Sequence, residues 1–234
     1  METAVLSQNE KMPLPVYEKV FSAAEKGVIS ATHENLQCLK SLSAHFAKNC
    51  VRTLDRGFDA NDYYRYFLKN DEKFVIRSKK NRNVIYNGKT QNIMDVAGNY
   101  KGNYRMDFKD KHGKKIECKI SYIPVQLCEF PNKTLVLVAV YGFGAQPMLL
   151  LTNLDLSEKK KLCMIATKVY LMRWRIEECS KRIFDVSKFI FYGLGYAIER
   201  VLARTHSGIK GFLLKKEQSQ QLTLAECFAE LGFK

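Results

Sequence analysis

The chain has 234 residues, of which 46% are hydrophobic, and its 38 Lys and Arg against 24 Asp and Glu give a formal net charge of +14. This composition is ordinary for a globular protein with a full core, in one large domain or two small ones. The charge favours a polyanionic partner, because Lys and Arg displace counterions from phosphates, although an inert basic surface would carry the same charge.

Local patterns argue against several other classes of protein. The seven cysteines include no C-x-x-C pair and are odd in number, so we expect reduced thiols in a cytosol rather than a disulfide framework. The four histidines lack the spacing of metal ligands, and residues 1–11 lack the apolar run of a secretory signal. Gly142, Gly144 and Pro147 interrupt the most apolar stretch, residues 135–151, which fits two buried strands joined by a turn better than a membrane span.

The chain begins with an extended segment, a helix and a short strand. Residues 13–21 are expected to be extended, with prolines at the start. Thr32 can cap a helix that runs to about Lys48, because apolar residues recur there near helical spacing. Residues 51–54 then form a short strand, and Asp55 stands at its C-terminal end.

A second helix and strand follow the sharp exit that Gly57 permits. Asn61 or Asp62 can cap this helix, and residues 74–77 form the strand. The alternation of helix and strand predicts an α/β layer built on a mixed sheet.

From residue 81 to residue 153 the pattern changes to short strands. Turn signals occur at Asn87-Gly88, Lys101-Gly102 and His112-Gly113, so we interpret this stretch as an antiparallel β-rich insertion. Basic and aromatic residues alternate in it, which is typical of a DNA-facing β surface, but ordinary strands with lysine-protected edges fit as well. The basic residues are Lys79, Lys80, Arg82, Lys101, Arg105, Lys109, Lys111, Lys114 and Lys115, and the aromatic ones are Tyr86, Tyr100, Tyr104 and Phe108.

The chain becomes helical after Asp155. Asp155 and Glu158 resemble a capping box, and the apolar residues that follow have the three-four spacing of one buried helix face. Tyr170, Arg173 and Glu177 are each one position beyond this stripe, so we expect them on one flank, between core and solvent. The stripe consists of Leu162, Ile165, Val169, Met172, Ile176, Cys179 and Ile183, and a further helix is expected over residues 186–203.

Two acidic motifs stand far apart in the chain, Leu54-Asp55-Arg56-Gly57-Phe58-Asp59 and Tyr170-x2-Arg173-Trp174-x2-Glu177. Phosphodiester cleavage and strand transfer can use two divalent cations, and Mg²⁺ prefers oxygen ligands. A carboxylate at a strand end and another on a helix flank are suitable donors. Each motif alone also fits a simple structural role, as a turn or as an i,i+4 pair on an exposed helix.

Together, in this order and with the strand-rich stretch between them, the motifs resemble those of DDE transposases of the insertion-sequence-four type, over roughly residues 13–178. The resemblance implies an α/β, RNase H-like mixed sheet with helices, interrupted by an antiparallel β-rich insertion. It divides the chain into a partial RNase H-like core with the second catalytic Asp (1–80), the insertion (81–153), the helical end of the core with the Glu (154–204) and a C-terminal tail (205–234).

The resemblance also implies roles for single residues. Asp55 and Glu177 would be catalytic acids and ligands of Mg²⁺ or Mn²⁺. Tyr170 and Arg173 would contact DNA phosphates, Arg173 through two hydrogen bonds from its guanidinium group. Lys181, Arg56 and Arg77 are further candidates for phosphate contacts. The implied partners are double-stranded DNA and a second copy of the chain, and the implied location is the bacterial cytoplasm, at the nucleoid, without a membrane.

Two features depart from the family pattern. Residues 1–54 contain no Asp, whereas the family carries its first catalytic Asp on an early strand, so we expect the chain to begin after that strand and to lack N-terminal strands. Phe184 stands where the signature has Lys. Three hypotheses therefore remain open: a DDE transposase, a catalytically inactive DNA-binding remnant that could inhibit a complete transposase, and a product without a stable fold.

Overall fold

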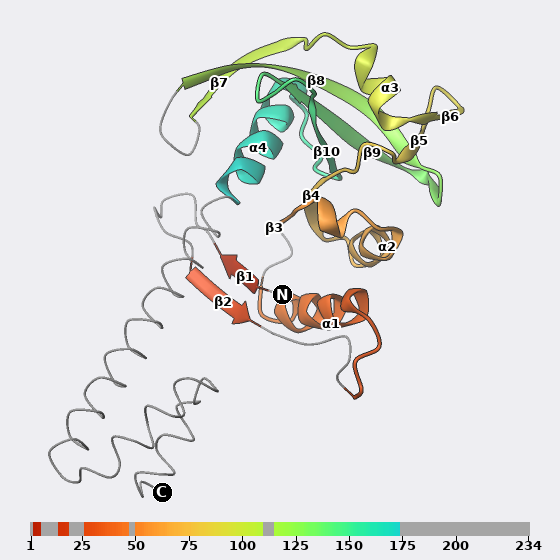
Figure 1. Cartoon of the computed structure of the whole chain (residues 1–234), viewed down its shortest axis with the longest axis vertical. Coiled ribbons are helices and arrows are strands. Elements are labelled where there is room, and N and C mark those ends of the chain that lie inside the picture. Colours follow the sequence, from red (N-terminus) through yellow and green to blue (C-terminus); the bar gives the residue numbers. More distant parts are fainter. Residues whose placement is uncertain (1, 6–13, 19–25, 47–49, 110–114, 174–234) are drawn as a thin grey trace, which may run out of the picture. The chain divides into compact units, whose positions relative to one another are not determined.

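A computed structural model describes residues 2–5, 14–18, 26–46, 50–109 and 115–173 (Figure 1). All of them belong to the first of two compact units, residues 1–177. The strands are β1 (Glu2–Val5), β2 (Leu14–Glu18), β3 (Val51–Leu54), β4 (Lys73–Arg77), β5 (Asn83–Tyr86), β6 (Lys89–Asn92), β7 (Tyr104–Lys109), β8 (Lys115–Leu127), β9 (Phe130–Tyr141) and β10 (Met148–Thr152). The helices are α1 (Ala31–Ser43), α2 (Asn61–Lys69), α3 (Ile93–Gly98) and α4 (Lys159–Met172), with a 3₁₀ turn η1 at Arg56–Phe58.

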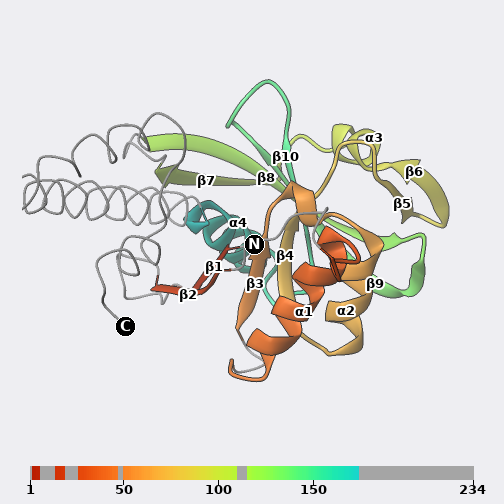
Figure 2. The same ribbon diagram turned by 60° about the horizontal axis from the view of Figure 1, so that its bottom comes forward.

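The described residues form a mixed α/β fold with one large, mostly antiparallel sheet. Its eight strands follow the order β3-β4-β10-β9-β8-β5-β6, and β7 also pairs with β8. Only β3 and β4 run parallel, and α2 forms the crossover between them, since parallel neighbours need a long connection. Figure 2 shows β3 and β4 side by side with α1 and α2 beside them. β1 and β2 form a separate antiparallel pair, so the expected extended segment is a strand.

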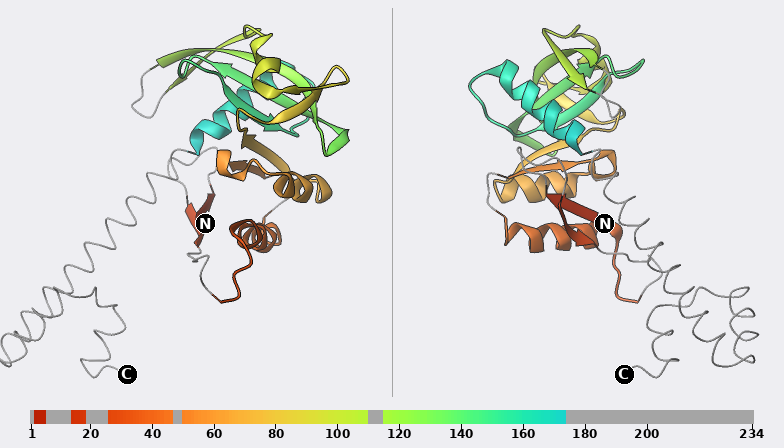
Figure 3. Two further views of the ribbon diagram at one scale, coloured as in Figure 1. Left: turned by 45° about the vertical axis from the view of Figure 1, so that its right-hand side comes forward. Right: turned by 90° about the vertical axis from the view of Figure 1, so that its left-hand side faces the viewer.

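Both faces of the sheet are buried, and each face has its own core. Residues of α1, α2 and α3, such as Leu39, Phe67 and Val96, pack on one face. Helix α4 covers the other face with Leu162 and Tyr170, and Figure 3 shows it lying across the strands. Covering both faces lets the central strands be apolar at every position rather than at alternate ones.

The apolar stretch of residues 135–151 forms two strands, as predicted. Residues 135–140 of β9 are all buried, and their side chains alternate between the two cores. β10 pairs antiparallel with β9 after a loop that contains Gly142, whose φ of +123° is in the region that favours glycine. Among the described residues, no helix is long and apolar enough to cross a membrane.

The predicted helix starts are wrong at three places. Ser30, not Thr32, caps α1, because its hydroxyl accepts the His33 N–H at 3.1 Å, and the helix ends at Ser43 rather than near Lys48. Ala60 precedes α2 without a side-chain cap, since Asn61 lies within the helix and accepts a bond from an arginine. Helix α4 begins only at Lys159, after Glu158 and without a capping box.

The strand-rich stretch contains one helix that its turn signals do not predict. Asn92 starts α3 by accepting the Met94 N–H at 2.8 Å, and the helix buries Ile93, Val96 and Ala97. The predicted turn at Asn87-Gly88 is confirmed, because it joins β5 to β6 with positive φ at both residues. The strands of residues 81–153 continue the same sheet as β3 and β4, since β10 pairs directly with β4.

Candidate functional site

The carboxylate of Asp55 lies at the C-terminal end of β3, as predicted. It is half-buried, and its Oδ1 accepts the Gly57 N–H at 2.8 Å, which caps the turn η1. A Cβ on residue 57 would lie 3.1 Å from that oxygen. Gly57 therefore serves the close return of the carboxylate rather than an unusual φ angle. One oxygen of Asp55 is held by the backbone, which orients the side chain at the strand end.

The second acid of the same motif, Asp59, has a different role. Its side chain is completely buried and accepts the Tyr64 hydroxyl at 2.7 Å, the Ser78 hydroxyl at 3.1 Å and the Lys79 N–H at 2.6 Å. The Arg82 Nε lies 2.5 Å from Asp59 Oδ1, as an ion pair rather than an aligned hydrogen bond. Both oxygens are thus occupied, so Asp59 holds the loop after β4 against α2 and is not available to a ligand.

Several basic residues surround the end of the sheet at which Asp55 lies. Leu54 pairs with Ile76, so Asp55 and Arg77 follow side by side in the parallel pair. Strand alternation places Arg77 on the face covered by α4, where its antiparallel partner Leu150 also packs. Arg56, which follows Asp55, is exposed, as are Lys79 and Lys80, which come shortly after Arg77. We call Asp55, Arg56, Arg77, Lys79 and Lys80 the Asp55 end of the sheet.

The second motif lies at the end of α4, and only part of it is described. Tyr170 is 0% exposed, so its expected position between core and solvent is wrong. The buried stripe of α4 is Leu162, Cys163, Ala166, Thr167 and Tyr170. It is rotated from the predicted stripe, because the small side chains of Cys163, Ala166 and Thr167 let the helix pack closely on the sheet.

At the end of α4, the guanidinium group of Arg173 packs against the aromatic ring of Tyr170. The Arg173 Cζ lies 5.6 Å from the centre of the Tyr170 ring, in a cation–π arrangement. The Tyr170 hydroxyl is buried and has no hydrogen-bond partner in the described part of the chain. Glu177 and Lys181 lie outside the described residues, as does the predicted helix over residues 186–203.

The described residues do not by themselves make a metal site. Within them, no group of three or more His, Cys, Asp or Glu side chains could hold a metal ion. Asp55 is the one expected ligand that is described, and the four groups around Asp59 occupy the neighbouring carboxylate. A divalent ion prefers several oxygen ligands, so no chemical step through a metal can be built from these residues.

The alternating basic and aromatic residues of the strand-rich stretch face different ways. The half-buried rings of Tyr104 and Phe108 in β7 pack against the core under α4. Tyr86 and Tyr100 pack against the opposite core, and their hydroxyls form a hydrogen bond at 2.7 Å. This hydrogen bond, with a smaller effect of burial, raises the pKa of Tyr100 to about 12. These half-buried rings therefore contribute to the packing of the fold.

Of the basic residues in this stretch, some are exposed and others are used within the protein. Lys101 and Arg105 are exposed, whereas Arg82 is held by Asp59. Lys115 forms an ion pair with Asp107 at 2.7 Å, and that neighbour raises the pKa of Lys115. The turn at His112-Gly113 and two of the lysines, Lys111 and Lys114, lie outside the described residues.

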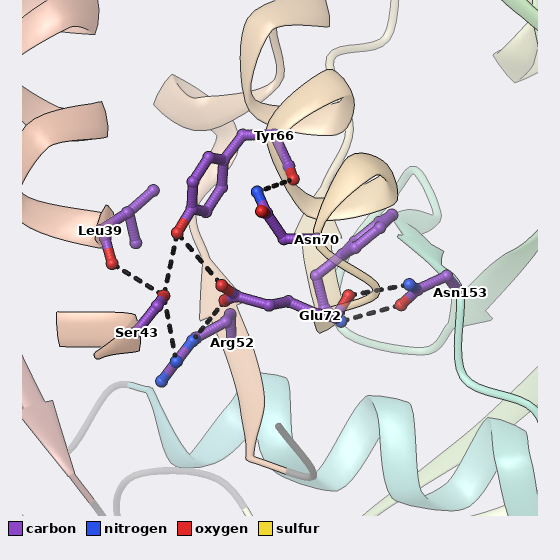
Figure 4. A network of polar contacts seen from close by, with 8 residues as sticks. Leu39, Ser43, Arg52, Tyr66, Asn70, Glu72 and Asn153 are labelled. Atoms are coloured by element: carbon purple, nitrogen blue, oxygen red, sulfur yellow. Dashed lines mark hydrogen bonds and ion pairs between the residues drawn. The ribbon is translucent and has the colours of Figure 1, made fainter. Parts of the chain in front are cut away.

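A polar network that the sequence did not predict lies at the opposite end of β3 and β4 (Figure 4). Arg52 Nε donates to Glu72 at 3.1 Å, and the Tyr66 hydroxyl donates to Glu72 at 3.1 Å and lies 2.9 Å from the Ser43 hydroxyl. Asn153 binds the Glu72 carbonyl oxygen at 2.8 Å. Ser43, Arg52, Tyr66 and Glu72 of this network line a hollow of about 920 Å³ beside α1 and α2. No motif signals it, because its members are scattered singly along the chain.

The thiols of the described residues are free, as expected. Burial raises the pKa of Cys163 to about 12. Burial, with a smaller effect of Asp107, raises the pKa of Cys118 to about 11. Both groups therefore remain protonated thiols at neutral pH and are poor nucleophiles and metal ligands.

Comparison of the whole sequence with protein-family models and with curated proteins finds no match.

Proposed function

We propose that this chain is a DDE transposase of the insertion-sequence-four type, which binds double-stranded DNA in DNA transposition. The observation that carries the proposal is the position of Asp55 at the C-terminal end of a parallel strand, ahead of a strand-rich stretch and of a helix that carries Tyr170 and is followed directly by Arg173. Ligands of α/β sheets bind beyond the C-terminal ends of parallel strands. The motif residues thus occur on suitable elements, in the order of the family.

The arrangement of the elements supports an RNase H-like core within this proposal. β3, α2 and β4 form a parallel crossover unit, helices cover both faces, and the long antiparallel strands come between β4 and α4. In this interpretation β5 to β10 correspond to the β-rich insertion. The RNase H-like core would then consist of the parallel pair with its helices and of α4.

The residues around Asp55 are suited to holding a phosphate backbone. Arg56, Lys79 and Lys80 are exposed at the Asp55 end of the sheet, and Arg77 lies beside Asp55. Arg can bind a phosphate with two parallel hydrogen bonds, and Lys acts as a point charge. In the family, Asp55 and Glu177 would hold Mg²⁺ or Mn²⁺, which supplies the activation of the attacking oxygen. What the described residues contribute is the positioning of DNA next to one backbone-oriented carboxylate.

A second candidate function is DNA binding without cleavage, with inhibition of a complete transposase by occupation of its sites. It is favoured by the absence of Asp from residues 1–54 and of any metal-binding cluster from the described ranges. It uses the same basic residues. The two candidates therefore agree on binding and differ on cleavage.

A nicking assay on duplex DNA with Mg²⁺ or Mn²⁺ separates the two candidates. We expect Asp55→Asn and Glu177→Gln to abolish any cleavage, and the control Asp95→Asn, an exposed acid of α3, to leave it unchanged. Cleavage that survives Asp55→Asn would show that the proposed site is wrong. Salt-sensitive binding without cleavage would support the second candidate. Absence of DNA binding would contradict both, and a chain without a cooperative melting transition would support the hypothesis of no stable fold.

A further inference from the structure

The outer side of α4 carries lysines that no residue of the described part of the chain neutralises. Lys160, Lys161 and Lys168 are exposed, and Met164, which lies between them, is 43% exposed. Lys160 and Lys161 precede Met164 by four and three residues and precede Lys168 by eight and seven, so all four lie on one side of the helix. We call these four residues the lysine face of α4. The opposite side of the helix is buried against the sheet.

The position of the lysines in the first turn of α4 does not favour the helix itself. The first turn of α4 carries three lysines and no acid, whereas a helix N-terminus has a partial positive charge and prefers acids. Lys159 compensates by lying 5.3 Å from the centre of the Tyr122 ring. Within the described residues, Lys160, Lys161 and Lys168 form no ion pair. The charges of Lys160 and Lys161, which lie in the first turn, therefore oppose the helix dipole without a local gain.

The chemistry of the face selects one kind of polyanion. A helix that lies on a lipid surface needs large apolar residues beside its lysines. Met164 is the one large apolar residue of α4 that is fully in the exposed class, since the other apolar side chains of the helix are buried or half-buried. Lys160 and Lys168 are eight residues apart, about 12 Å along the helix. This length is close to the width of the major groove of B-DNA, about 12 Å, so the two ends of the face can reach phosphates on both sides of a groove.

We propose that the lysine face of α4 binds the phosphate backbone of double-stranded DNA, as a contact separate from the Asp55 end of the sheet. The inference rests on the proposed function, since it takes duplex DNA as the partner. It adds a second positioning surface, formed by a rigid helix that is packed on the sheet. Such contacts orient DNA on a protein without reading its sequence.

The test compares three variants of the full chain with equal loss of charge. The first, K160Q/K161Q/K168Q, changes the lysine face. The second, R56Q/K79Q/K80Q, changes the Asp55 end of the sheet. The third, K26Q/K89Q/K133Q, is a control on exposed lysines elsewhere. Binding of a fluorescent 30-base-pair duplex is measured from 50 to 200 mM salt, with melting curves of every protein.

We expect the first variant to lower the slope of log affinity against log salt by about 2 to 3, because each phosphate contact contributes about 0.9. The loss of affinity between 50 and 200 mM salt would then be about 40-fold smaller than for the unchanged chain, and the control would retain the original slope. The melting temperature of the first variant should stay equal or rise, since the lost charges of Lys160 and Lys161 oppose the helix dipole in the first turn.

Other results would overturn the inference, in distinguishable ways. An unchanged slope in the first variant, with a reduced slope in the second, would refute the lysine face and leave the proposed function standing. A lower melting temperature in the first variant would show that the lysines serve the fold. Tighter, lysine-dependent binding to an RNA hairpin or to anionic lipid vesicles than to the duplex would refute DNA as the partner. Absence of duplex binding by the unchanged chain would refute both proposals.

Discussion

Replacing Asp59 by Ala should destabilise the protein far more than replacing Asp55, although the two acids are four residues apart in one motif. The Asp59 side chain is 0% exposed and its ion-pair partner Arg82 is 13% exposed. The change leaves the Arg82 charge without its partner. It also removes the acceptor of the Tyr64 hydroxyl, of the Ser78 hydroxyl and of one backbone N–H.

The size of the effect follows from these contacts. Breaking a buried ion pair by removing one partner costs about 3–5 kcal/mol, and the lost hydrogen bonds belong to the same network, so their costs are not added separately. For a chain of this length, about 1 kcal/mol lowers the melting temperature by about 2–4 °C. Asp59→Ala should therefore melt about 6–20 °C lower. Asp55→Ala loses a single cap bond at 2.8 Å and should cost about 0.5–2 kcal/mol.

Thermal and urea denaturation of the two variants would measure the difference, with Asp62→Ala as a surface control. Asp62 pairs with Arg65, but both side chains are more than half exposed, so this change should cost at most about 1 kcal/mol. A double-mutant cycle of Asp59 and Arg82 should show a coupling of about 0.5–3 kcal/mol. Equal stability of the Asp59 and Asp55 variants, or no coupling with Arg82, would refute the structural role assigned to Asp59.

Three further predictions concern the rest of the described fold. Gly102→Ala should lower the free energy of unfolding, measured by urea denaturation, by about 1–3 kcal/mol. The reason is that Gly102 has a φ of +83° and that a Cβ there would lie 2.4 Å from the Lys119 Cβ. The control Gly98→Ala, with open space around it, should be neutral or stabilising. Peptide mapping after brief alkylation at pH 8 should find Cys128, which is exposed, modified and Cys163 protected, and equal labelling would contradict the burial of Cys163. The pKa of Cys163 in the folded chain, about 12, lies above its ordinary value of 9.0, so above pH 9 the unfolded chain binds fewer protons than the folded one. The contribution of this thiol to stability should therefore be present below pH 9 and be lost as pH rises toward 12. The pH dependence of the urea midpoint, compared between Cys163→Ala and the unchanged chain, would show this loss.

Much of the element order could be predicted because most elements, α3 excepted, have a local signal. The β-branched run at residues 135–140 and the glycines after it indicated two strands, and Asn87-Gly88 indicated a tight hairpin. Asp55 was placed correctly because a short apolar strand and a glycine enclose it. These signals depend on neighbours in the sequence, so they do not need the rest of the fold.

The helix caps and the buried side of α4 could not be predicted in the same way. Ser30 and Thr32 are both residue types that cap helices well, and the residue at which α1 begins in the folded chain decides that Ser30 is the cap. The side of α4 that faces the sheet depends on which side chains are small enough for close packing, and Thr167 with its hydroxyl bonded to the Cys163 carbonyl at 2.8 Å joined the buried side. Hydrophobic spacing alone therefore misplaced the stripe and left Tyr170 at its border.

The sequence by itself determined the α/β class, the place of the strand-rich stretch and the position of Asp55 at a strand end, because spacing and turn residues encode them locally. Only the tertiary structure decided which of the two acids near β3 is free. Asp59 became a buried partner of Arg82, twenty-three residues away, while Asp55 kept only a local bond. The reason is physical: burial and ion pairing are properties of contacts between distant segments, and the sequence near Asp55 does not contain them.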